Sequence, residues 1–480
     1  MTLTSRPDRI PPPSRPTGLG RGSAPIVWRL PNGTVEVRVD RSEMPWDDLF
    51  VVASRYNPRR GYIFVSKVLG KHWPVRPVTM DRVHGSLARK LSELGLERPV
   101  VMIAMAETAV GLGRGIFDRL AELTSPDGLL FLQTTRHVTG GPALLTTDEP
   151  HCHARDHTVH VPAGDPEKAR ILAGARTLVL VDDEITTGET LKGLARAFVT
   201  RDGAPSWTAG SGVASGQAGA NGGAGANVSG SANGGGGAPV SGGADGGAGA
   251  PVSGGANGGA GAPVSAGANG GGGVPGPCGT PGVGRVVMCS IASFLTQEAM
   301  DAMSSGVPVP VSHVSLLKGT FTFAKTGEAP APPSGPFRSQ GTGEPLPGTV
   351  PLERGRLGLL PGEGLPDVAA ALGALALPPG VPVRVIGTGE FLHEPYLLAR
   401  ALEAEGRDVC FQSTTRTPIA PGGGIACSWR FADNYGEGLD NFLYNAPASF
   451  PGETVVCRET AASPAGFDIA SRLGAREIIL

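Results

Sequence analysis

The sequence predicts an α/β protein whose main domain is built on a parallel β-sheet and is followed by a smaller α/β domain. Short apolar runs at residues 100–105, 178–181 and 285–293 have the composition of strands that are covered on both faces of a sheet. The first two runs are followed by apolar residues at helical spacing, as expected where strands and helices alternate. A second set of such runs begins at residue 383, after a stretch rich in proline and glycine. These observations indicate two α/β units in one chain.

The N-terminal part of the chain is expected to hold a tail and a hairpin. Residues 1–24 are rich in proline, arginine and serine and show no hydrophobic periodicity, so we expect a disordered tail. Residues 26–30 and 34–39 then flank a Pro-Asn-Gly turn, and this pattern predicts a β-hairpin. The folded part of the chain is therefore expected to begin at residue 25.

Residues 203–284 consist largely of glycine, alanine, serine and asparagine, and a twelve-residue unit recurs from Ala238, Ala250 and Ala262. Each unit offers one valine and almost no charged or aromatic residue, so these units cannot bury a core of their own. Because an apolar run that predicts a strand follows this segment, we interpret it as a flexible insertion inside the main domain. The expected division is a main domain at residues 25–324 that contains the insertion, a linker at 325–349 and a smaller domain at 350–480.

The composition of the chain narrows the classes of partner. The formal net charge is -2 at pH 7, which argues against a general binder of nucleic acid or of anionic membranes. The six cysteines form no CxxC pair, and no apolar run reaches the ~20 residues of a membrane span or resembles a signal peptide. We therefore expect a cytoplasmic protein whose partners are small anions.

The most informative string is LVLVDDEITTGET at residues 178–190. Its apolar residues predict a buried strand that ends at Val181, where the charged residues begin. Asp182 and Asp183 then lie at the carboxyl end of the strand, where α/β sheets bind ligands, and can accept hydrogen bonds from ribose hydroxyls. The following turn can surround one phosphate with backbone N–H groups and hydroxyls. The residues of this turn are Glu184, Thr186, Thr187, Gly188, Glu189 and Thr190.

A plainer interpretation is that the two aspartates only cap the next helix. Leu191, Leu194, Ala195 and Phe198 fall at helical spacing, so the positive end of a helix dipole is expected to face the same turn. The chain contains no GxxxxGK[ST] string, which excludes a P-loop. The whole string therefore favours a site for a sugar phosphate over a simple helix cap.

Two further strand ends carry candidate site residues. The run at residues 100–105 leads into a loop of mostly small residues, which an ordinary strand-to-helix turn would also explain. The strand predicted from residue 62 leads to three basic groups whose charge suits a pyrophosphate, although a solvated strand end explains them nearly as well. The loop residues are Glu107, Thr108, Ala109, Val110 and Gly111, and the basic residues are Lys67, Lys71 and His72.

Histidines gather in one part of the main domain. Five of the nine lie within 24 residues, at positions 137, 151, 153, 157 and 160. A metal site with His151, His153 and His157 as weak candidates, a polar lining of an active-site flap, and incidental solvated residues all stay open. Because the spacing matches no closed zinc pattern, we assign no metal ion that the protein itself holds.

The smaller domain repeats a pattern of the main domain. A strand, a glutamate loop, a helix, a second strand and Thr-Thr-Arg occur first with Glu107 and Arg136 and again with Glu390 and Arg416. The second occurrence has no DDxxTTG string, so we do not expect it to hold a ribose phosphate by itself. Glu390 and Arg416 are therefore candidates for a second-domain site.

The string at residues 178–190 resembles the loop that binds phosphoribosyl pyrophosphate (PRPP) in type I phosphoribosyltransferases. Together with SKVLGKH, TRTP and DNYGEGLDNFLYN, the chain resembles the phosphoribosyltransferases with a C-terminal TRSP domain that occur in bacterial tellurium-resistance and stress gene clusters. The resemblance covers residues 25–200 and 285–470. Thr417 stands where the TRSP motif has serine, a change that keeps the hydroxyl.

This resemblance implies a Rossmann-like parallel sheet with a hood, and a PRPP-dependent enzyme. It implies that the loop at residues 107–111 holds the pyrophosphate of PRPP, and that a mobile catalytic loop lies near Arg136. Arg136 is then a candidate for offsetting the charge of the departing pyrophosphate, together with Lys67 and Lys71, although a surface arginine without contacts is the alternative. Mg²⁺ is also implied, bound mainly through PRPP itself.

The expected reaction is displacement of pyrophosphate from PRPP by a nitrogen nucleophile, a nucleobase or related small molecule, through an oxocarbenium-like transition state. Asp182 and Asp183 would orient the ribose and stabilise its developing positive charge. The alternatives are a non-catalytic regulator that binds PRPP, and a phosphohydrolase or scaffold protein in a stress-response gene cluster. The acceptor and the oligomeric state, a homodimer included, stay open.

Overall fold

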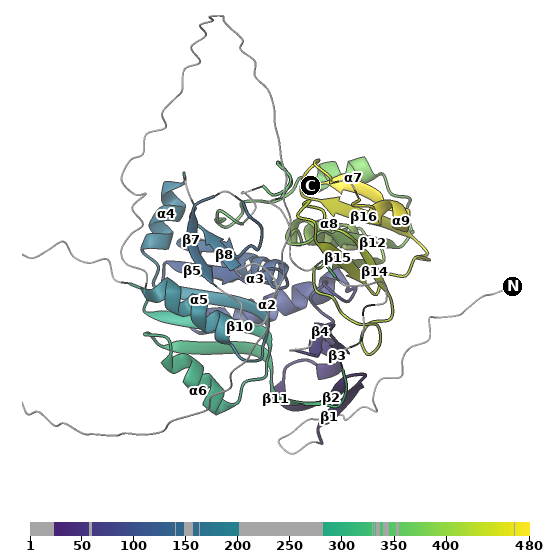
Figure 1. The fold of residues 1–480 in the computed structure, drawn as a ribbon. Helices are drawn as coiled ribbons and strands as arrows, with labels where there is room; N and C mark the ends of the chain where they lie inside the picture. The colour runs from purple at the N-terminus through teal and green to yellow at the C-terminus, as the bar shows by residue number, and fades with distance from the viewer. Residues whose placement is uncertain are drawn as a thin grey trace, which may run out of the picture. The chain divides into compact units, whose positions relative to one another are not determined.

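The structure is a computed structural model of the 480-residue chain (Figure 1). Nearly all of the expected N-terminal tail and of the Gly-rich insertion, and parts of the expected linker, fall outside the residues that it describes. The described residues are 24–56, 60–139, 141–147, 157–162, 164–200, 282–328, 330, 332, 337–338, 345–351, 355–464 and 466–480.

A seven-stranded, mainly parallel sheet confirms the α/β fold of the main domain. Its strand order is β1-β2-β11-β10-β9-β5-β6 (Figure 1). β1 pairs antiparallel with β2 across the Pro-Asn-Gly turn, which confirms the predicted hairpin, and β2 pairs antiparallel with β11. The strands are β1 Ile26–Leu30, β2 Gly33–Ser42, β5 Val100–Ala104, β6 Leu129–Gln133, β9 Thr177–Ile185, β10 Arg285–Ser293 and β11 Val311–Lys325.

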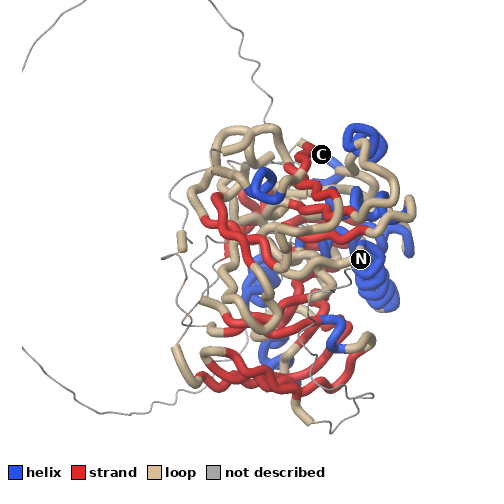
Figure 2. Tube along the Cα trace, turned by 90° about the vertical axis from the view of Figure 1, so that its right-hand side faces the viewer, coloured by secondary structure: helices blue, strands red, loops and turns tan. Residues whose placement is uncertain are grey.

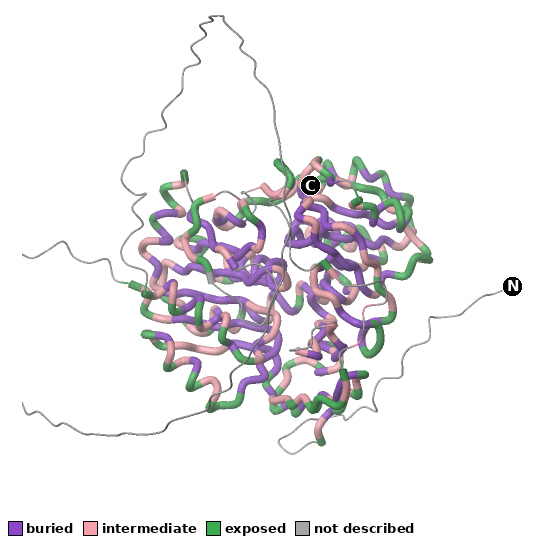
Figure 3. The backbone as a smooth tube through the Cα atoms, viewed as in Figure 1, coloured by how far each residue is buried: buried purple, intermediate pink, exposed green. Residues whose placement is uncertain are grey.

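Helices cover both faces of this sheet, which explains the continuous apolar runs of its central strands. Along β5, Val100, Met102 and Ala104 belong to the core with α2 and α3, whereas Val101 and Ile103 belong to the core with α4, α5 and α6. Figure 3 shows these strands as buried. Each buried Val, Ile or Met side chain stabilises the fold by about 1.5–3 kcal/mol relative to an exposed one. The helices are α2 Pro77–Glu93, α3 Val110–Leu123, α4 Pro166–Ala173, α5 Glu189–Thr200 and α6 Gln297–Ser305.

An aromatic cluster joins a small hairpin to the end of β10. The ring of Phe64 stacks on that of Phe294 with their centroids 4.3 Å apart, and Phe50 meets Phe64 edge-on at 5.4 Å. Such ring pairs add to the stability that burial of the rings provides. The elements concerned are α1 Trp46–Leu49, β3 Phe50–Ser54 and β4 Tyr62–Ser66, and a second hairpin in the domain is made by β7 Ala143–Thr147 and β8 His157–His160.

The smaller domain has its own parallel sheet, with the strand order β13-β12-β16-β17. Figure 2 shows its strands in red and its helices in blue. The face of β12 that bears Val383 and Val385 packs on α7 and α8, and Ile386 on the other face packs on α9. The elements are α7 Val368–Leu375, β12 Val383–Gly387, α8 His393–Ala404, β13 Val409–Ser413, β14 Ser428–Ala432, β15 Asp440–Tyr444, β16 Glu453–Arg458, α9 Ile469–Leu473 and β17 Arg476–Ile479.

The expected linker at residues 325–349 is in part packed on the smaller domain. β11 continues through Lys325, and Arg338 forms an ion pair with Asp440 at 3.1 Å. The Thr349 hydroxyl donates to the backbone carbonyl of Tyr435 at 3.0 Å. Among the described helices, none has the length and apolar character needed to cross a membrane.

The prediction that the strand of the acidic string ends at Val181 is wrong. β9 continues through Asp182, Asp183 and Glu184 to Ile185. The physical reason is the partner strand β10, whose residues pair with β9 up to Ser293, whereas β5 stops pairing at Val181. The acidic residues therefore lie on a strand end that projects beyond its neighbour β5.

Candidate functional site

The acidic strand end of β9 meets the loop that precedes α3. The Thr108 hydroxyl donates to Asp183 Oδ1 at 3.1 Å, and the Asp183 backbone N–H donates to Asp182 Oδ1 at 2.9 Å. Glu184 forms an ion pair with Arg60 at 2.7 Å. The structure therefore brings together the predicted sugar site and the loop at residues 107–111.

Burial shapes the protonation of these carboxyl groups. Burial and the neighbouring Asp183 carboxylate raise the pKa of Asp182 well above its ordinary value, and burial also raises the pKa of Asp183. Burial raises the pKa of Glu184 to about 7, even though Arg60 opposes the shift. The strand end therefore gains stability from a bound cation or from hydroxyl groups that donate to it.

The turn after β9 leads directly into α5, as the string predicts. Gly188 has a φ of 71°, and a Cβ at this position would lie 2.1 Å from the Met303 sulfur. The Lys192 N–H donates to the Gly188 carbonyl at 2.8 Å, which is the first turn of the helix. The buried face of α5 consists of the predicted residues, Leu191, Leu194, Ala195 and Phe198.

The polar groups of this turn are open to solvent. Thr187 and Glu189 are exposed, and Thr186 and Thr190 are partly exposed. N–H groups at the start of a helix lack partners within the helix and attract anions. The turn can therefore receive a phosphate without rearrangement of the core behind it.

Glu107 turns inward from its loop. Its carboxylate forms an ion pair with the Lys71 ammonium at 2.7 Å and accepts the Arg416 backbone N–H at 3.3 Å. Lys71 is buried and also donates to the Gly389 carbonyl at 2.7 Å. Burial opposes ionisation, but Lys71 and Arg416 together lower the pKa of Glu107. In the next positions along the loop, Ala109, Val110 and Gly111 are buried at the start of α3.

The three basic residues after β4 do not form the expected set of cations. The Lys67 ammonium donates to the Asp47 carbonyl at 2.5 Å, whereas Lys71 is paired with Glu107. The ring of His72 is buried and lies 6.0 Å from that of Tyr444, and burial lowers its pKa to about 3. His72 is therefore neutral at physiological pH, and the expectation that it adds positive charge is wrong.

Arg136 lies in a network that involves the smaller domain. Its backbone N–H donates to Glu390 Oε1 at 3.0 Å, and the Thr135 hydroxyl donates to Glu390 Oε2 at 2.7 Å. One guanidinium nitrogen of Arg136 lies 3.0 Å from His157 Nε2. Arg136 is therefore held through its backbone, and it is not the contact-free surface arginine of the alternative reading.

The structure gives no support to a histidine metal site in the residues that it describes. Both ring nitrogens of His157 have partners, since Nδ1 lies 2.9 Å from the Thr134 hydroxyl and Nε2 faces Arg136. The other two weak candidates, His151 and His153, lie outside the described residues. Within the described ranges, no group of three or more His, Cys, Asp or Glu side chains could hold a metal ion.

A buried set of charged groups around Glu390 and Arg416 extends beyond the residues that the sequence pattern identified. Arg356 pairs with Glu390 at 3.2 Å and with Glu459 at 2.6 Å, while Arg416 pairs with Glu437 at 2.7 Å. Sequence reasoning missed Arg356, Glu437 and Glu459. Glu459 carried a usable signal, because it follows β16 as the acidic pair follows the apolar run of β9.

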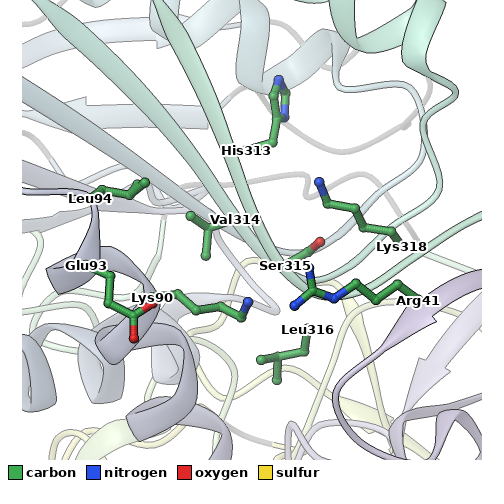
Figure 4. Close-up of a pocket in the computed structure, with 9 residues that line it drawn as sticks. All are labelled: Arg41, Lys90, Glu93, Leu94, His313, Val314, Ser315, Leu316 and Lys318. Carbon is green, nitrogen blue, oxygen red and sulfur yellow. The ribbon is translucent and has the colours of Figure 1, made fainter.

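Two cavities of the main domain lie beside charged side chains. One adjoins the acidic strand end and is lined by Leu49, Phe50, Phe64, Ser66, Asp183, Glu184, Ile291, Ala292 and Phe294. The other, of about 230 Å³, lies between β11 and the end of α2 (Figure 4). Of its basic residues, Arg41 and Lys90 both pair with Glu43, and Lys318 lines the cavity as well. The first cavity adjoins the site through Asp183 and Glu184, but its volume is only about 10 Å³, the room of a single water.

Two family models match the chain. A family model described as phosphoribosyl transferase matches residues 49–208, and a model described as the TRSP domain C-terminal to it matches residues 355–471. A search of curated proteins finds no match. One similar solved structure is adenine phosphoribosyl transferase from Trypanosoma brucei in complex with AMP, pyrophosphate and ribose-5-phosphate. It is 10% identical, covers 56% of this chain and 77% of its own, and has a TM-score of 0.28, which is too low to support an argument.

Proposed function

The chain belongs to the phosphoribosyltransferases that carry a C-terminal TRSP domain, and we propose that it transfers the phosphoribosyl group of PRPP to a nitrogen nucleophile. The observation that carries the proposal is the strand end of β9. There Asp182 and Asp183 stand beside a solvent-open turn at the start of α5, in the domain that matches the transferase family.

Two partly buried carboxyl groups suit a ribose. Vicinal hydroxyls of the sugar donate to Asp182 and Asp183, and these bonds replace the water that burial has removed. As pyrophosphate leaves, positive charge develops on the ribose ring, and nearby carboxylates stabilise it. The 5′-phosphate binds the N–H groups and hydroxyls from Thr186 to Thr190, where the dipole of α5 favours negative charge.

The pyrophosphate lies beside the loop that begins at Glu107. Thr108 connects this loop to Asp183, so sugar and pyrophosphate bind at adjacent positions. Arg136, together with Lys67, offsets the charge that the leaving group gains. Lys71 stabilises the loop through Glu107 and acts on the pyrophosphate indirectly.

The residues at the strand end fit a hard divalent cation such as Mg²⁺. Asp182 and Asp183 offer carboxylate oxygens whose unfavourable burial a cation would relieve, and PRPP would supply the other oxygens. When bound, Mg²⁺ neutralises negative charge on the pyrophosphate and so makes it a better leaving group.

The proposed acceptor carries a ring nitrogen that loses a proton on attack. The cavity beside Asp183 and Glu184 measures only about 10 Å³, and the faces of Phe64 and Phe294 in its lining stack on each other, so it holds no flat ring as it stands. With a pKa of about 7, Glu184 can accept a proton from the attacking nitrogen near neutral pH. A nucleobase or a related heterocycle has this chemistry.

A second candidate function is the binding of PRPP without turnover. The observation that favours it is that two of the three basic residues expected at the pyrophosphate do not face it as cations, since Lys71 pairs with Glu107 and burial lowers the pKa of His72 to about 3. Incubation with PRPP, Mg²⁺ and a panel of nucleobases, scored for pyrophosphate release, separates the two functions. Release that depends on one base supports transfer, and tight PRPP binding without release supports a regulator. Release without any base supports a phosphohydrolase.

A further inference from the structure

The smaller domain has the same topology as the parallel core of the main domain. The strand order β13-β12-β16-β17 matches β6-β5-β9-β10, and both sheets are parallel. In each sheet the first residue of the central strand, Val100 or Val383, faces the first residue of both neighbouring strands. A helix follows each central strand and a hairpin follows each edge strand. We call the two units the first copy and the second copy.

Equivalent positions in the two copies make the same local hydrogen bonds. Thr134 accepts the Ala106 N–H at 2.8 Å, and Thr414 accepts the Gly389 N–H at 2.9 Å. A second matched pair is His137 N–H to Thr135 Oγ1 and Thr417 N–H to Thr415 Oγ1, both at 3.2 Å. The similar sequences around Glu107 and Glu390 therefore adopt the same backbone conformation.

Each copy also forms backbone hydrogen bonds with the edge strand of the other copy's sheet. Leu359 makes two backbone hydrogen bonds with Phe131 on the edge strand of the first copy, both at 2.9 Å. Val75 makes the equivalent bonds with Phe411 on the edge strand of the second copy, at 2.9 and 2.8 Å. Phe131 and Phe411 are both the third residue of their strands. Each copy therefore contributes one residue that pairs with the edge strand of the other copy.

Glu107 and Glu390 each bond to the opposite copy. Glu390 of the second copy accepts the Arg136 N–H of the first at 3.0 Å, and Glu107 of the first accepts the Arg416 N–H of the second at 3.3 Å. Glu390 additionally accepts the Thr135 hydroxyl at 2.7 Å. Each Thr-Thr-Arg segment is therefore held by the glutamate of the opposite copy.

The second copy differs where the sugar site would lie. Counting from the first residues of β9 and β16, Arg458 and Glu459 occupy the places of Asp182 and Asp183. Glu459 is buried in its ion pair with Arg356. A ribose needs two hydrogen-bond acceptors there, and the second copy offers one guanidinium and one carboxylate that is already paired.

We propose that the C-terminal domain is a second copy of the transferase core that has lost its own sugar site and positions the loops of the first copy. Glu390 is a positioning residue for Arg136, to which it bonds through the backbone. Arg416 is a positioning residue for Glu107, whose neighbour Thr108 bonds to Asp183. This inference rests on the proposed function, because it assigns these contacts to the site for PRPP.

The test compares Glu390→Gln with Glu403→Gln in the full chain. Glu403 is a matched control, because it too belongs to the second copy and accepts bonds from an arginine and a backbone N–H of the main domain, Arg76 at 3.0 Å and Val78 at 2.7 Å. Calorimetry with Mg²⁺ measures the affinities for inorganic pyrophosphate and for ribose 5-phosphate separately. Melting temperature reports stability independently of both affinities.

We expect Glu390→Gln to weaken pyrophosphate binding about tenfold or more, because a bond to a charged acceptor is lost beside Arg136. Ribose 5-phosphate binding should stay within about twofold, and Glu403→Gln should leave both affinities within that range. Should Glu390→Gln fold poorly, Thr135→Val removes the same hydroxyl bond at less cost to the buried charges.

Three outcomes would overturn the inference. If Glu390→Gln and Thr135→Val bind pyrophosphate as the wild type does, the positioning role fails while the proposed function stands. If the wild-type chain binds two PRPP molecules, the second copy has kept its site. If the wild-type chain binds no PRPP at all, both the proposed function and this inference fail.

Discussion

The Thr108 hydroxyl and Asp183 Oδ1 are 3.1 Å apart and connect the loop before α3 to the acidic strand end of β9. Through this bond a residue expected to hold pyrophosphate touches a residue expected to hold ribose. The bond is possible because β9 projects past β5, with which it stops pairing at Val181. The contact between Thr108 and Asp183 therefore follows from the greater length of β9 relative to β5.

Asp183→Asn should reduce PRPP-dependent pyrophosphate release by about 100-fold or more, because the amide cannot supply the negative charge that stabilises the transition state. Burial raises the pKa of Asp183, so the neutral amide should leave the melting temperature unchanged or higher. Asp165→Asn is the control, since asparagine also caps a helix such as α4. Full turnover in Asp183→Asn would contradict its role.

Gly188→Ala should abolish PRPP binding and destabilise the chain by about 1–2 kcal/mol, because its φ of 71° is unfavourable for a residue with a Cβ. Gly193→Ala in the same helix is the matched control. A Cβ at Gly193 meets no atom within 4 Å, so this change should stabilise the helix by about 0.5–1 kcal/mol. Calorimetry and urea unfolding measure the two effects. Equal behaviour of the two variants would refute the assigned role of the turn.

The stability of the chain should depend on pH through Glu184. Its pKa is about 7 in the folded protein and 4.5 ordinarily, so the folded state holds the extra proton between these values. The contribution of Glu184 to the free energy of unfolding is then fully present below pH 4.5. It is lost as the pH rises through 7, and the loss is roughly 3 kcal/mol. Unfolding of the wild type and of Glu184→Gln at pH 4 to 8 should show their difference change over this window. A constant difference would mean that Glu184 ionises normally.

Lys71→Met should mainly lower the stability of the chain, whereas Lys67→Met should mainly weaken pyrophosphate binding. Lys71 is fully buried, and its loss leaves Glu107 charged and unpaired by the ammonium, which should cost about 3–5 kcal/mol. Lys67 is partly exposed, so Lys67→Met should lower stability by less than about 1 kcal/mol while weakening pyrophosphate binding. Unfolding by urea and calorimetry with pyrophosphate measure these outcomes. A stable Lys71→Met variant would show that the buried pair contributes little.

The sugar site could be predicted because its parts are contiguous in the sequence. The acidic pair, the turn at Gly188 and the buried face of α5 lie within one string, so local chemistry is enough to identify them. The length of β9 could not be predicted, since it depends on pairing with β10, which follows the long Gly-rich insertion. The direction in which a side chain points after a strand could not be predicted either, as the burial of His72 shows.

The sequence predicted only part of the relation between the two copies. The repeated glutamate and Thr-Thr-Arg segments indicated a second unit of similar form. The pattern did not show that Glu107 and Glu390 each bond to the opposite copy, because contacts between distant segments leave no local signal. Arg356 was missed for the same reason, since its partners Glu390 and Glu459 are brought together only by the fold.

Calorimetric titration of the full chain with PRPP and Mg²⁺ measures whether the β9 strand end binds a sugar phosphate. We predict saturable binding of one PRPP per chain, which disappears in Gly188→Ala and weakens in Asp183→Asn. A wild-type chain that is fully folded and gives no binding heat would contradict the assignment of the β9 strand end as a sugar-phosphate site.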